Sequence, residues 1–164
     1  MIKRGGGVQD IRIRELNQSF SKQYSLDIVV NVCEAMGANI VNRICERAKA
    51  ELSSMGIKTG IAILSNYCVE RKALGWFEIP VKKLSWKGTN GYDVAEKILE
   101  AYEFARSDRF RAVTHNKGIM NGIDSVCLAT GQDWRAVESA AHSYASRNQS
   151  YQPLSCYELV EKQG

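Results

Sequence analysis

The stretch that decides the fold is YSLDIVVNVCEAMGANIVNRICERAKAELSSMG, residues 24–56. Its opening, YSLDIVVNV, is rich in β-branched and apolar residues and predicts a strand. After a turn that contains Gly37, apolar residues recur at helical spacing and form one stripe, at Ile40, Val41, Ile44, Ala48 and Leu52. Gly56 is a natural C-cap for this helix. The stretch therefore predicts a strand that passes through a glycine turn into an amphipathic helix.

The segments on either side predict more strands. Upstream, VQDIRIREL alternates apolar and polar residues from Val8 to Leu16, with a slip near Gln9 and Asp10, and predicts an antiparallel hairpin with residues 24–32. Downstream, IKTGIAILSN at residues 57–66 predicts a third strand. The order strand–strand–helix–strand is that of the second half of a split β-α-β fold. We therefore expect an α+β chain with a partial ferredoxin-like (split β-α-β) part.

The second half of the chain is predicted to be helical. Residues 70–90 are irregular, with at most a short strand within residues 76–84. Apolar spacing then predicts helices over residues 92–105, 115–130 and 133–146, and the last two are separated by the breaker TGQD. The tail from residue 148 has no periodicity.

Composition excludes several classes of protein. The 164 residues are 45% hydrophobic and 24% charged, which is typical of a globular domain, and no apolar run is long enough for a membrane span. The start MIKRGGG has no apolar core of a signal peptide. Five scattered cysteines without a CxxC pair favour a reducing, cytoplasmic setting and no metal site. The net charge of +4 favours a polyanionic ligand such as a nucleotide or coenzyme, but it is too diffuse to predict nucleic-acid binding.

Polar groups lie at the ends of two predicted strands, and each set has either a ligand-binding or a purely structural explanation. In CEAMGAN, residues 33–39, the backbone N–H groups at a helix start can hold a phosphate, although a turn of this kind is more often purely structural. In ILSNY, Ser65 and Asn66 end the predicted third strand, where ligand-binding groups often lie. An asparagine that stabilises a turn explains this second pattern equally well.

The stretch THNKGIMNGID, residues 114–124, is the least ordinary. On a helix from His115, Lys117, Asn121 and Asp124 fall along one face. The residues expected to face the core are Ile119, Ile123, Val126 and Cys127. Gly118 and Gly122 permit close approach by a ligand or another backbone. A lysine in such a place can stabilise a developing oxyanion, but an ordinary Lys–Asp helix pair is the alternative.

The segment HNKGIMNGIDSVCLATGQDWRAVESAAHSYASR closely resembles the catalytic segment of class II 3-hydroxy-3-methylglutaryl-CoA (HMG-CoA) reductases. EAMGAN is similar to the dinucleotide-binding DAMGAN motif of that family, and ILSN, the GGG start and FARSDRFRAVTHNKG match in order and spacing. The resemblance covers nearly the whole chain. It implies that residues 1–75 are the second half of a small NAD(P)-binding domain and that residues 76–164 are part of a helical large domain that binds HMG-CoA.

The resemblance implies a reaction and residues that carry it. The family reduces HMG-CoA to mevalonate and CoA, a step of isoprenoid metabolism, by two hydride transfers from NAD(H) or NADP(H), or runs the reverse oxidation. Lys117 matches the catalytic lysine, and Asp133 matches the aspartate that hydrogen-bonds to it. Arg111, Asn121 and Asn66 match positions that bind the substrate. The turn against the cofactor is matched by Glu34, Met36, Gly37, Ala38 and Asn39, with Glu34 in place of the usual aspartate.

The resemblance also implies what these residues lack. The catalytic glutamate of the family belongs to an ENVIG-type segment upstream, and its catalytic histidine lies downstream, so neither His115 nor His142 is in the matching context. We therefore expect the 164 residues alone to be nearly inactive. The family forms homo-oligomers, in which the active sites lie across a dimer interface.

Two other functions remain open on the sequence. One is a non-catalytic remnant that binds a ligand or mediates oligomerisation, for which Lys117→Ala would have no effect. The other is a Schiff-base enzyme with Lys117 as nucleophile, which a nearby Asp133 disfavours because it keeps the ammonium charged.

Overall fold

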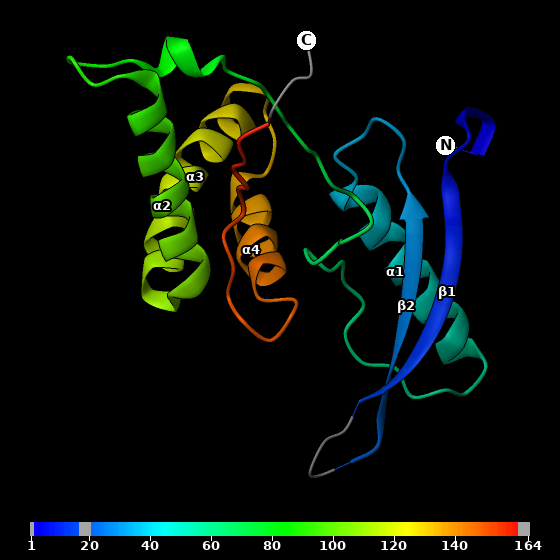
Figure 1. The fold of residues 1–164 in the computed structure, drawn as a ribbon. Helices are drawn as coiled ribbons and strands as arrows, with labels where there is room; N and C mark the ends of the chain where they lie inside the picture. The colour runs from blue at the N-terminus through cyan, green and yellow to red at the C-terminus, as the bar shows by residue number, and fades with distance from the viewer. Residues whose placement is uncertain (1, 17–20, 161–164) are drawn as a thin grey trace. The chain divides into compact units, whose positions relative to one another are not determined.

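A computed structural model describes residues 2–16 and 21–160 and divides the chain into two compact units, Met1–Ser65 and Asn66–Gly164 (Figure 1). The first unit holds two strands and one long helix, and the second holds three long helices. Each unit is described by itself. The domain boundary that the sequence suggests, after residue 75, stays a prediction.

The first unit begins with the predicted hairpin. After a short 3-10 turn, η1 (Ile2–Arg4), strand β1 (Gly7–Leu16) pairs antiparallel with β2 (Gln23–Asn31). The register shifts between Val8 and Asp10, which confirms the slip in the apolar–polar alternation as a β-bulge. Of the loop predicted between the strands, residues 17–20 lie outside the described part of the chain.

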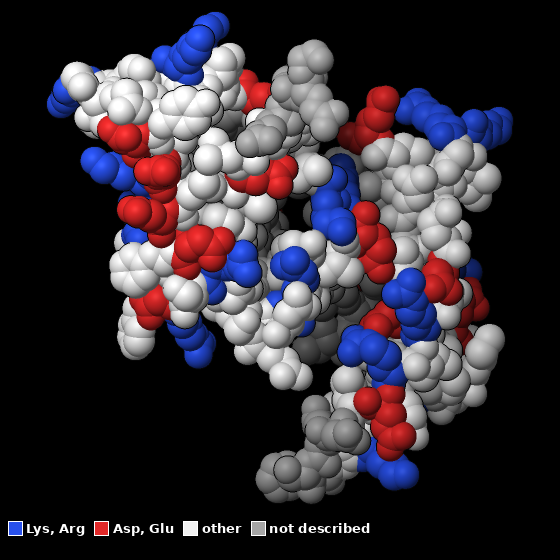
Figure 2. Space-filling model, in the orientation of Figure 1, with Lys and Arg blue, Asp and Glu red and all other residues white. Residues whose placement is uncertain are grey.

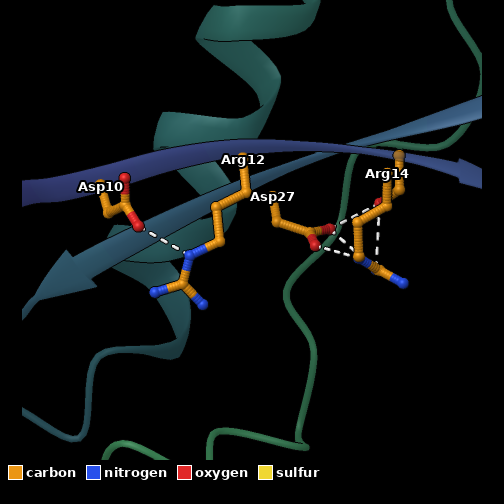
Figure 3. A network of polar contacts seen from close by, with 5 residues as sticks. Asp10, Arg12, Arg14 and Asp27 are labelled. Carbon is orange, nitrogen blue, oxygen red and sulfur yellow. Dashed lines mark hydrogen bonds and ion pairs between the residues drawn. The ribbon is translucent and has the colours of Figure 1, made fainter.

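One face of the hairpin carries a polar network (Figure 3). Arg14 forms an ion pair with Asp27 across the strands, and the Ser25 hydroxyl donates to the same carboxylate at 2.6 Å. These two partners lower the pKa of Asp27 to about 2. On β1 itself, Arg12 pairs with Asp10 at 2.6 Å. The network is exposed, so it favours this face as the solvent side rather than adding much stability.

The other face of the hairpin is apolar and lies against helix α1 (Ala38–Ser54). An open cavity of about 390 Å³ remains between them, and Val8, Ile11, Ile28 and Ile44 are among its lining residues. The helix confirms the amphipathic pattern in the sequence. The hairpin covers the apolar side of this helix only in part, since many of its apolar residues stay half-buried.

Helix α1 ends as the sequence predicts. Gly56 has a φ of 81°, a left-handed conformation that suits glycine. Its N–H donates to the Ser53 carbonyl at 3.0 Å, and the next N–H, of Ile57, donates to the Leu52 carbonyl at 3.1 Å. These two bonds form a Schellman motif, which satisfies carbonyl groups of the last turn.

The prediction of a third strand at residues 57–66 is wrong. Among the described residues the sheet has two strands only, and this segment has no ladder partner. Instead, the Leu64 N–H donates to the side-chain oxygen of Asn42 at 2.8 Å. Ile61 and Ile63 stay 91% and 66% exposed. A segment with strand propensity becomes a strand only when a neighbouring strand supplies the hydrogen bonds, and none of the described strands does so.

The second unit contains η2 (Val81–Leu84), a 3-10 turn, and the helices α2 (Gly91–Ser107), α3 (Arg109–Ala129) and α4 (Trp134–Ala145). The three predicted helices are confirmed. Residues 76–84 hold no strand, only the 3-10 turn. Gly91 packs so closely on η2 that an added Cβ would overlap the Val81 carbonyl, which explains a glycine at this helix start.

Helix α3 begins earlier than predicted. Asp108 is its N-cap, and the carboxylate of Asp108 accepts from the Arg111 N–H at 2.8 Å. The helix therefore starts at Arg109 rather than at His115. At its other end the predicted breaker acts as expected: Gly131 has a φ of 67°, and the Gln132 N–H donates to the Cys127 carbonyl at 2.8 Å.

The core of the second unit is built mostly from small residues where the three helices meet. Its buried members are Gly91, Ala95, Ala105, Ala112, Asn116, Met120, Cys127 and Ala145. Val126, expected in this core, is 63% exposed, because the buried face of α3 is centred on Asn116 and Met120. In the described parts of the chain no helix has the length and apolarity that crossing a membrane requires.

Residues 151–157, which we call the strap, follow α4 and run back over the helices. The Gln152 N–H donates to the Ala145 carbonyl at the end of α4, at 2.9 Å. The strap has no regular secondary structure, as predicted for the tail. Side chains nevertheless hold it to α2, where the Tyr102 hydroxyl lies 3.5 Å from the Cys156 Sγ atom, and to α3 and α4 through His115 and His142.

Candidate active site

Helix α3 presents an open polar surface around Lys117. Lys117 and Asn121, one turn apart, are both exposed. A Cβ added at Gly118 or at Gly122 would meet no atom within 4 Å, apart from the backbone of the helix itself. The helix surface beside the lysine is therefore bare of side chains, as the sequence suggests, and a ligand can approach it closely.

Asp124 differs from Lys117 and Asn121 in its surroundings. It is half-buried, and its Oδ1 atom is buried without a hydrogen-bond partner in the described chain. Between the described residues Lys117 and Asp124 there is no ion pair. The ordinary helix pair that was the alternative explanation for the lysine is therefore not formed.

Asp133 is placed at the start of α4. Its carboxylate caps the helix by accepting from the Ala136 N–H at 3.1 Å, and the residue is exposed. No hydrogen bond or ion pair joins Asp133 to Lys117, although both lie in the described part of the second unit. The structure thus gives this carboxylate a capping role and leaves one side of it free for another partner.

The remaining predicted substrate residues also lie in the second unit. Arg111 is half-buried in the first turn of α3, on the same helix as Lys117 and Asn121. Asn66 is exposed at the first position of the unit, and its carbonyl accepts from the Cys68 N–H at 3.0 Å. Two of the three predicted substrate residues, Arg111 and Asn121, therefore share α3 with Lys117, and Asn66 lies outside that helix.

The predicted cofactor turn belongs to the first unit. Gly37 is the N-cap of α1, with a φ of 100°, and it is buried so that an added Cβ would lie 2.8 Å from the Val32 side chain. No side chain caps this helix start. Its first N–H groups thus stay available for an anionic group, and the dipole of α1 favours negative charge there. Both features fit the phosphates of a dinucleotide.

The side chains of this turn face solvent to different degrees. Glu34 and Asn39 are exposed, Met36 is 49% exposed, and Ala38 is half-buried. The exposed positions flank the buried Gly37, so the backbone at this turn is reachable from outside the unit.

The glycine-rich start of the chain is tied to this turn. The Asn31 amide donates to the Gly5 carbonyl at 3.3 Å, and its oxygen accepts from the Cys33 N–H at 2.9 Å. The Cys33 thiol in turn lies 3.7 Å from the Arg4 carbonyl. The left-handed conformation of Cys33, with a φ of 55°, is thus held by its neighbours.

Sequence reasoning missed the buried Asn116, next to Lys117. Asn116 is 0% exposed, and its amide donates to the Gln152 carbonyl at 2.9 Å and accepts from the Leu154 N–H at 2.8 Å. The sequence offered one sign of this residue, because asparagine is unusual in the middle of a helix and here it stands beside a candidate catalytic lysine. Its partners could not be found from the sequence, since they lie 36 and 38 residues away.

Both histidines bind the strap. The His115 Nε2 atom lies 2.7 Å from the Ser155 hydroxyl, and the His142 Nδ1 atom lies 2.6 Å from the Tyr151 hydroxyl. Burial, and to a lesser degree the charge of Arg111, lower the pKa of His115. These contacts give both histidines a structural role.

Charged side chains of both signs are interspersed on the face seen in Figure 2. Red and blue groups alternate there over both units instead of forming a continuous basic stripe. This face of the described chain therefore has no broad basic patch.

Comparisons with known proteins agree with the motifs. The family model for hydroxymethylglutaryl-coenzyme A reductase matches residues 1–162. The 3-hydroxy-3-methylglutaryl-coenzyme A reductase of Archaeoglobus fulgidus is 40% identical over 165 residues, and the probable reductase of Borreliella burgdorferi is 38% identical over 156 residues. These alignments cover 99% and 94% of this chain, but the chain spans only 36% of the length of either relative.

Solved structures give the same result. A reductase from Streptococcus pneumoniae has a TM-score of 0.81 at 40% identity, with 97% of this chain and 43% of that chain covered. The class II reductase of the same organism, bound to NADPH in open conformations, has a TM-score of 0.80 at 40% identity, with 96% and 38% covered. The match of motifs, family model and fold shows that the chain belongs to the hydroxymethylglutaryl-coenzyme A reductase family.

Proposed function

We propose that these residues form the central part of an HMG-CoA reductase, which reduces HMG-CoA to mevalonate and CoA with NAD(H) or NADP(H). The observation that carries the proposal is the surface of α3, where the exposed Lys117 lies beside two bare glycine positions within the HNKGIMNG motif. The NADPH-bound class II neighbour supports a nicotinamide cofactor.

In this proposal Lys117 acts on the thioester carbonyl. Its ammonium group hydrogen-bonds to the oxygen on which negative charge develops, first on the thioester and later on the aldehyde. Two molecules of the reduced cofactor, bound one after the other, would each supply one hydride. Asp133 hydrogen-bonds to the ammonium in the assembled site, and its opposite charge stabilises the charged form of the lysine.

The other residues bind and orient the substrate and the cofactor. Arg111 pairs with the free carboxylate of the substrate, for which a guanidinium offers two parallel donors. Asn121 and Asn66 hydrogen-bond to the hydroxymethylglutaryl part. The turn that begins at Glu34 and runs from Met36 to Asn39 holds the phosphates of the cofactor at the uncapped start of α1.

The wider expectations belong to the same proposal. The small domain is completed to a split β-α-β sheet by another segment, and the active site forms across a dimer interface in the cytoplasm. The 164 residues alone are expected to show no turnover, because no segment among them matches the catalytic glutamate or histidine of the family, and both histidines present hold the strap.

The test is a chimera in which residues 1–164 replace the matching segment of the S. pneumoniae reductase. We expect HMG-CoA-dependent oxidation of NADPH, and we expect Lys117→Ala to lower kcat by about 100-fold or more. Lys49→Ala, on the wet side of α1, is the matched control. A chimera that is folded by circular dichroism but inactive would contradict the proposal, as would full turnover by the Lys117→Ala variant.

A non-catalytic remnant predicts the opposite pattern. In that case the Lys117→Ala chimera would match its parent. Comparison of the parent chimera with the Lys117→Ala chimera therefore distinguishes a reductase from a non-catalytic remnant.

A further inference from the structure

Asn116 is the one fully buried polar side chain among the described residues, and it directly precedes Lys117. An amide in the interior of a small-residue core is costly unless both of its polar groups are satisfied. Here both are satisfied by the strap: Nδ2 donates to the Gln152 carbonyl at 2.9 Å, and Oδ1 accepts from the Leu154 N–H at 2.8 Å. The amide thus binds the strap backbone much as a neighbouring strand would.

The strap connects the turn that carries Lys117 to a second helix. Next to the Asn116 bonds, the Gln152 N–H donates to the Ala145 carbonyl at the C-terminus of α4, and Tyr151 bonds to His142 on the same helix. The described residues of α3 and α4 are therefore cross-linked through the strap at the turn that bears the lysine. Asp133 is the N-cap of that same helix α4.

Rotation of a helix about its axis moves every side chain on it. Asn116 and Lys117 are successive residues, so the direction in which Asn116 points into the core sets the direction in which Lys117 leaves the helix. Asn116 fixes this direction through two directional hydrogen bonds to a backbone, whereas its buried apolar neighbours Ala112 and Met120 pack without directional bonds. An error of about 1 Å in a catalytic group can cost on the order of 100-fold in rate.

We propose that Asn116 is a positioning residue for Lys117, and that it sets the rotation of α3 by binding the backbone of the strap at residues 152 and 154. The inference rests on the proposed role of Lys117. It assigns no chemical step to Asn116, which touches neither substrate nor cofactor.

The strap contact is measured first in the 164-residue chain, without any assay of activity. Hydrogen exchange of the Leu154 amide should be slow in the parent chain and at least about 10-fold faster in Asn116→Ala, because the acceptor is lost. Asn116→Asp keeps an oxygen for this bond but buries a carboxylate against the Gln152 carbonyl, so it should not restore the slow exchange of the parent. Asn148→Ala, at an exposed asparagine, should leave the exchange unchanged.

Turnover is then measured in the chimera with the S. pneumoniae reductase. We expect kcat to fall by about 10-fold to 100-fold in Asn116→Ala, with KM for NADPH unchanged. Ser155→Ala removes a strap contact that does not involve Asn116 and should have a much smaller effect. Unfolding of part of the protein would also lower the apparent kcat at unchanged KM, so turnover is compared at equal folded fraction, measured by circular dichroism. A loss of turnover that only matches the loss of folded protein would overturn the inference.

The two proposals fail in different ways. If Lys117→Ala keeps full turnover, the proposed function is wrong. If Lys117→Ala is inactive while Asn116→Ala behaves like Asn148→Ala in kcat, only the positioning role is wrong. A Leu154 amide that exchanges equally fast in the parent and in Asn116→Ala would also overturn it.

Discussion

At the scale of single residues, Asp133 has to meet two demands. In the structure its carboxylate caps α4 through the Ala136 N–H. In the proposed reaction the same carboxylate holds the ammonium of Lys117. The cap requires only a hydrogen-bond acceptor, whereas the catalytic role requires a negative charge, so one pair of substitutions separates them.

Asp133→Asn keeps an acceptor and should leave the free energy of unfolding of the chain within about 0.5 kcal/mol of the parent. Asp133→Ala removes the cap and should cost about 1 kcal/mol, measured by urea denaturation. In the chimera both variants should lose turnover, by about 100-fold. Full turnover in Asp133→Asn would show that the aspartate serves α4 only.

At the scale of elements, the start of α1 is the feature on which the proposed cofactor binding rests. The helix begins at a buried glycine with a left-handed backbone, close against Val32, and without a side-chain cap. A side chain at Gly37 would strain the backbone and push Val32 away. The uncapped N–H groups would then no longer be aligned for phosphate.

Gly37→Ala should lower the free energy of unfolding by more than about 1 kcal/mol and weaken NADPH binding to the 164-residue chain. Thermal melting and titration of the cofactor fluorescence measure the two effects. Gly60→Ala is the matched control, because a Cβ at Gly60 meets no atom within 4 Å and its φ is not left-handed. NADPH binding that is equal in both variants would contradict a role for this turn.

The outcome for residues 57–66 also belongs to the element scale. Their β-branched residues express a real preference, yet Ile61 remains 91% exposed, without a strand beside it. Propensity indicates which conformation a segment accepts, but a strand also needs a neighbour, which a single segment cannot reveal. The helices were predicted well because their hydrogen bonds close within the segment, and the early start of α3 was missed only because the cap at Asp108 was overlooked.

At the scale of the whole molecule, the described chain has two compact units. In the second unit the strap contacts helices that are distant from it in the sequence. His115 lies on α3 of this unit, near the rings of Tyr102 and Tyr157 and one helical turn from Arg111. Burial first and the charge of Arg111 second lower the pKa of His115. Protonation of this imidazole therefore opposes the folded state.

The sign of the pH dependence follows from this lowered pKa. Below the ordinary histidine pKa of about 6.5 the unfolded chain binds the proton more readily, so stability is present above that pH and is lost as the pH falls through the folded pKa. Urea denaturation between about pH 7.5 and pH 5 should show this loss, and His115→Gln should reduce its slope. An unchanged slope in His115→Gln would exclude His115 as its source.

The sequence by itself determined the family, the four long helices and the hairpin with its bulge, and it predicted the residues of the candidate site. These features depend on short-range patterns: helical spacing, alternation, glycine turns and the HNKGIMNG motif. Only the tertiary structure decided that Asn116 is buried against the strap, that Asp133 caps α4, that Val126 faces outward and that residues 57–66 form no strand. Each of these depends on partners elsewhere in the fold, because burial and strand pairing are properties of the neighbours that folding brings together.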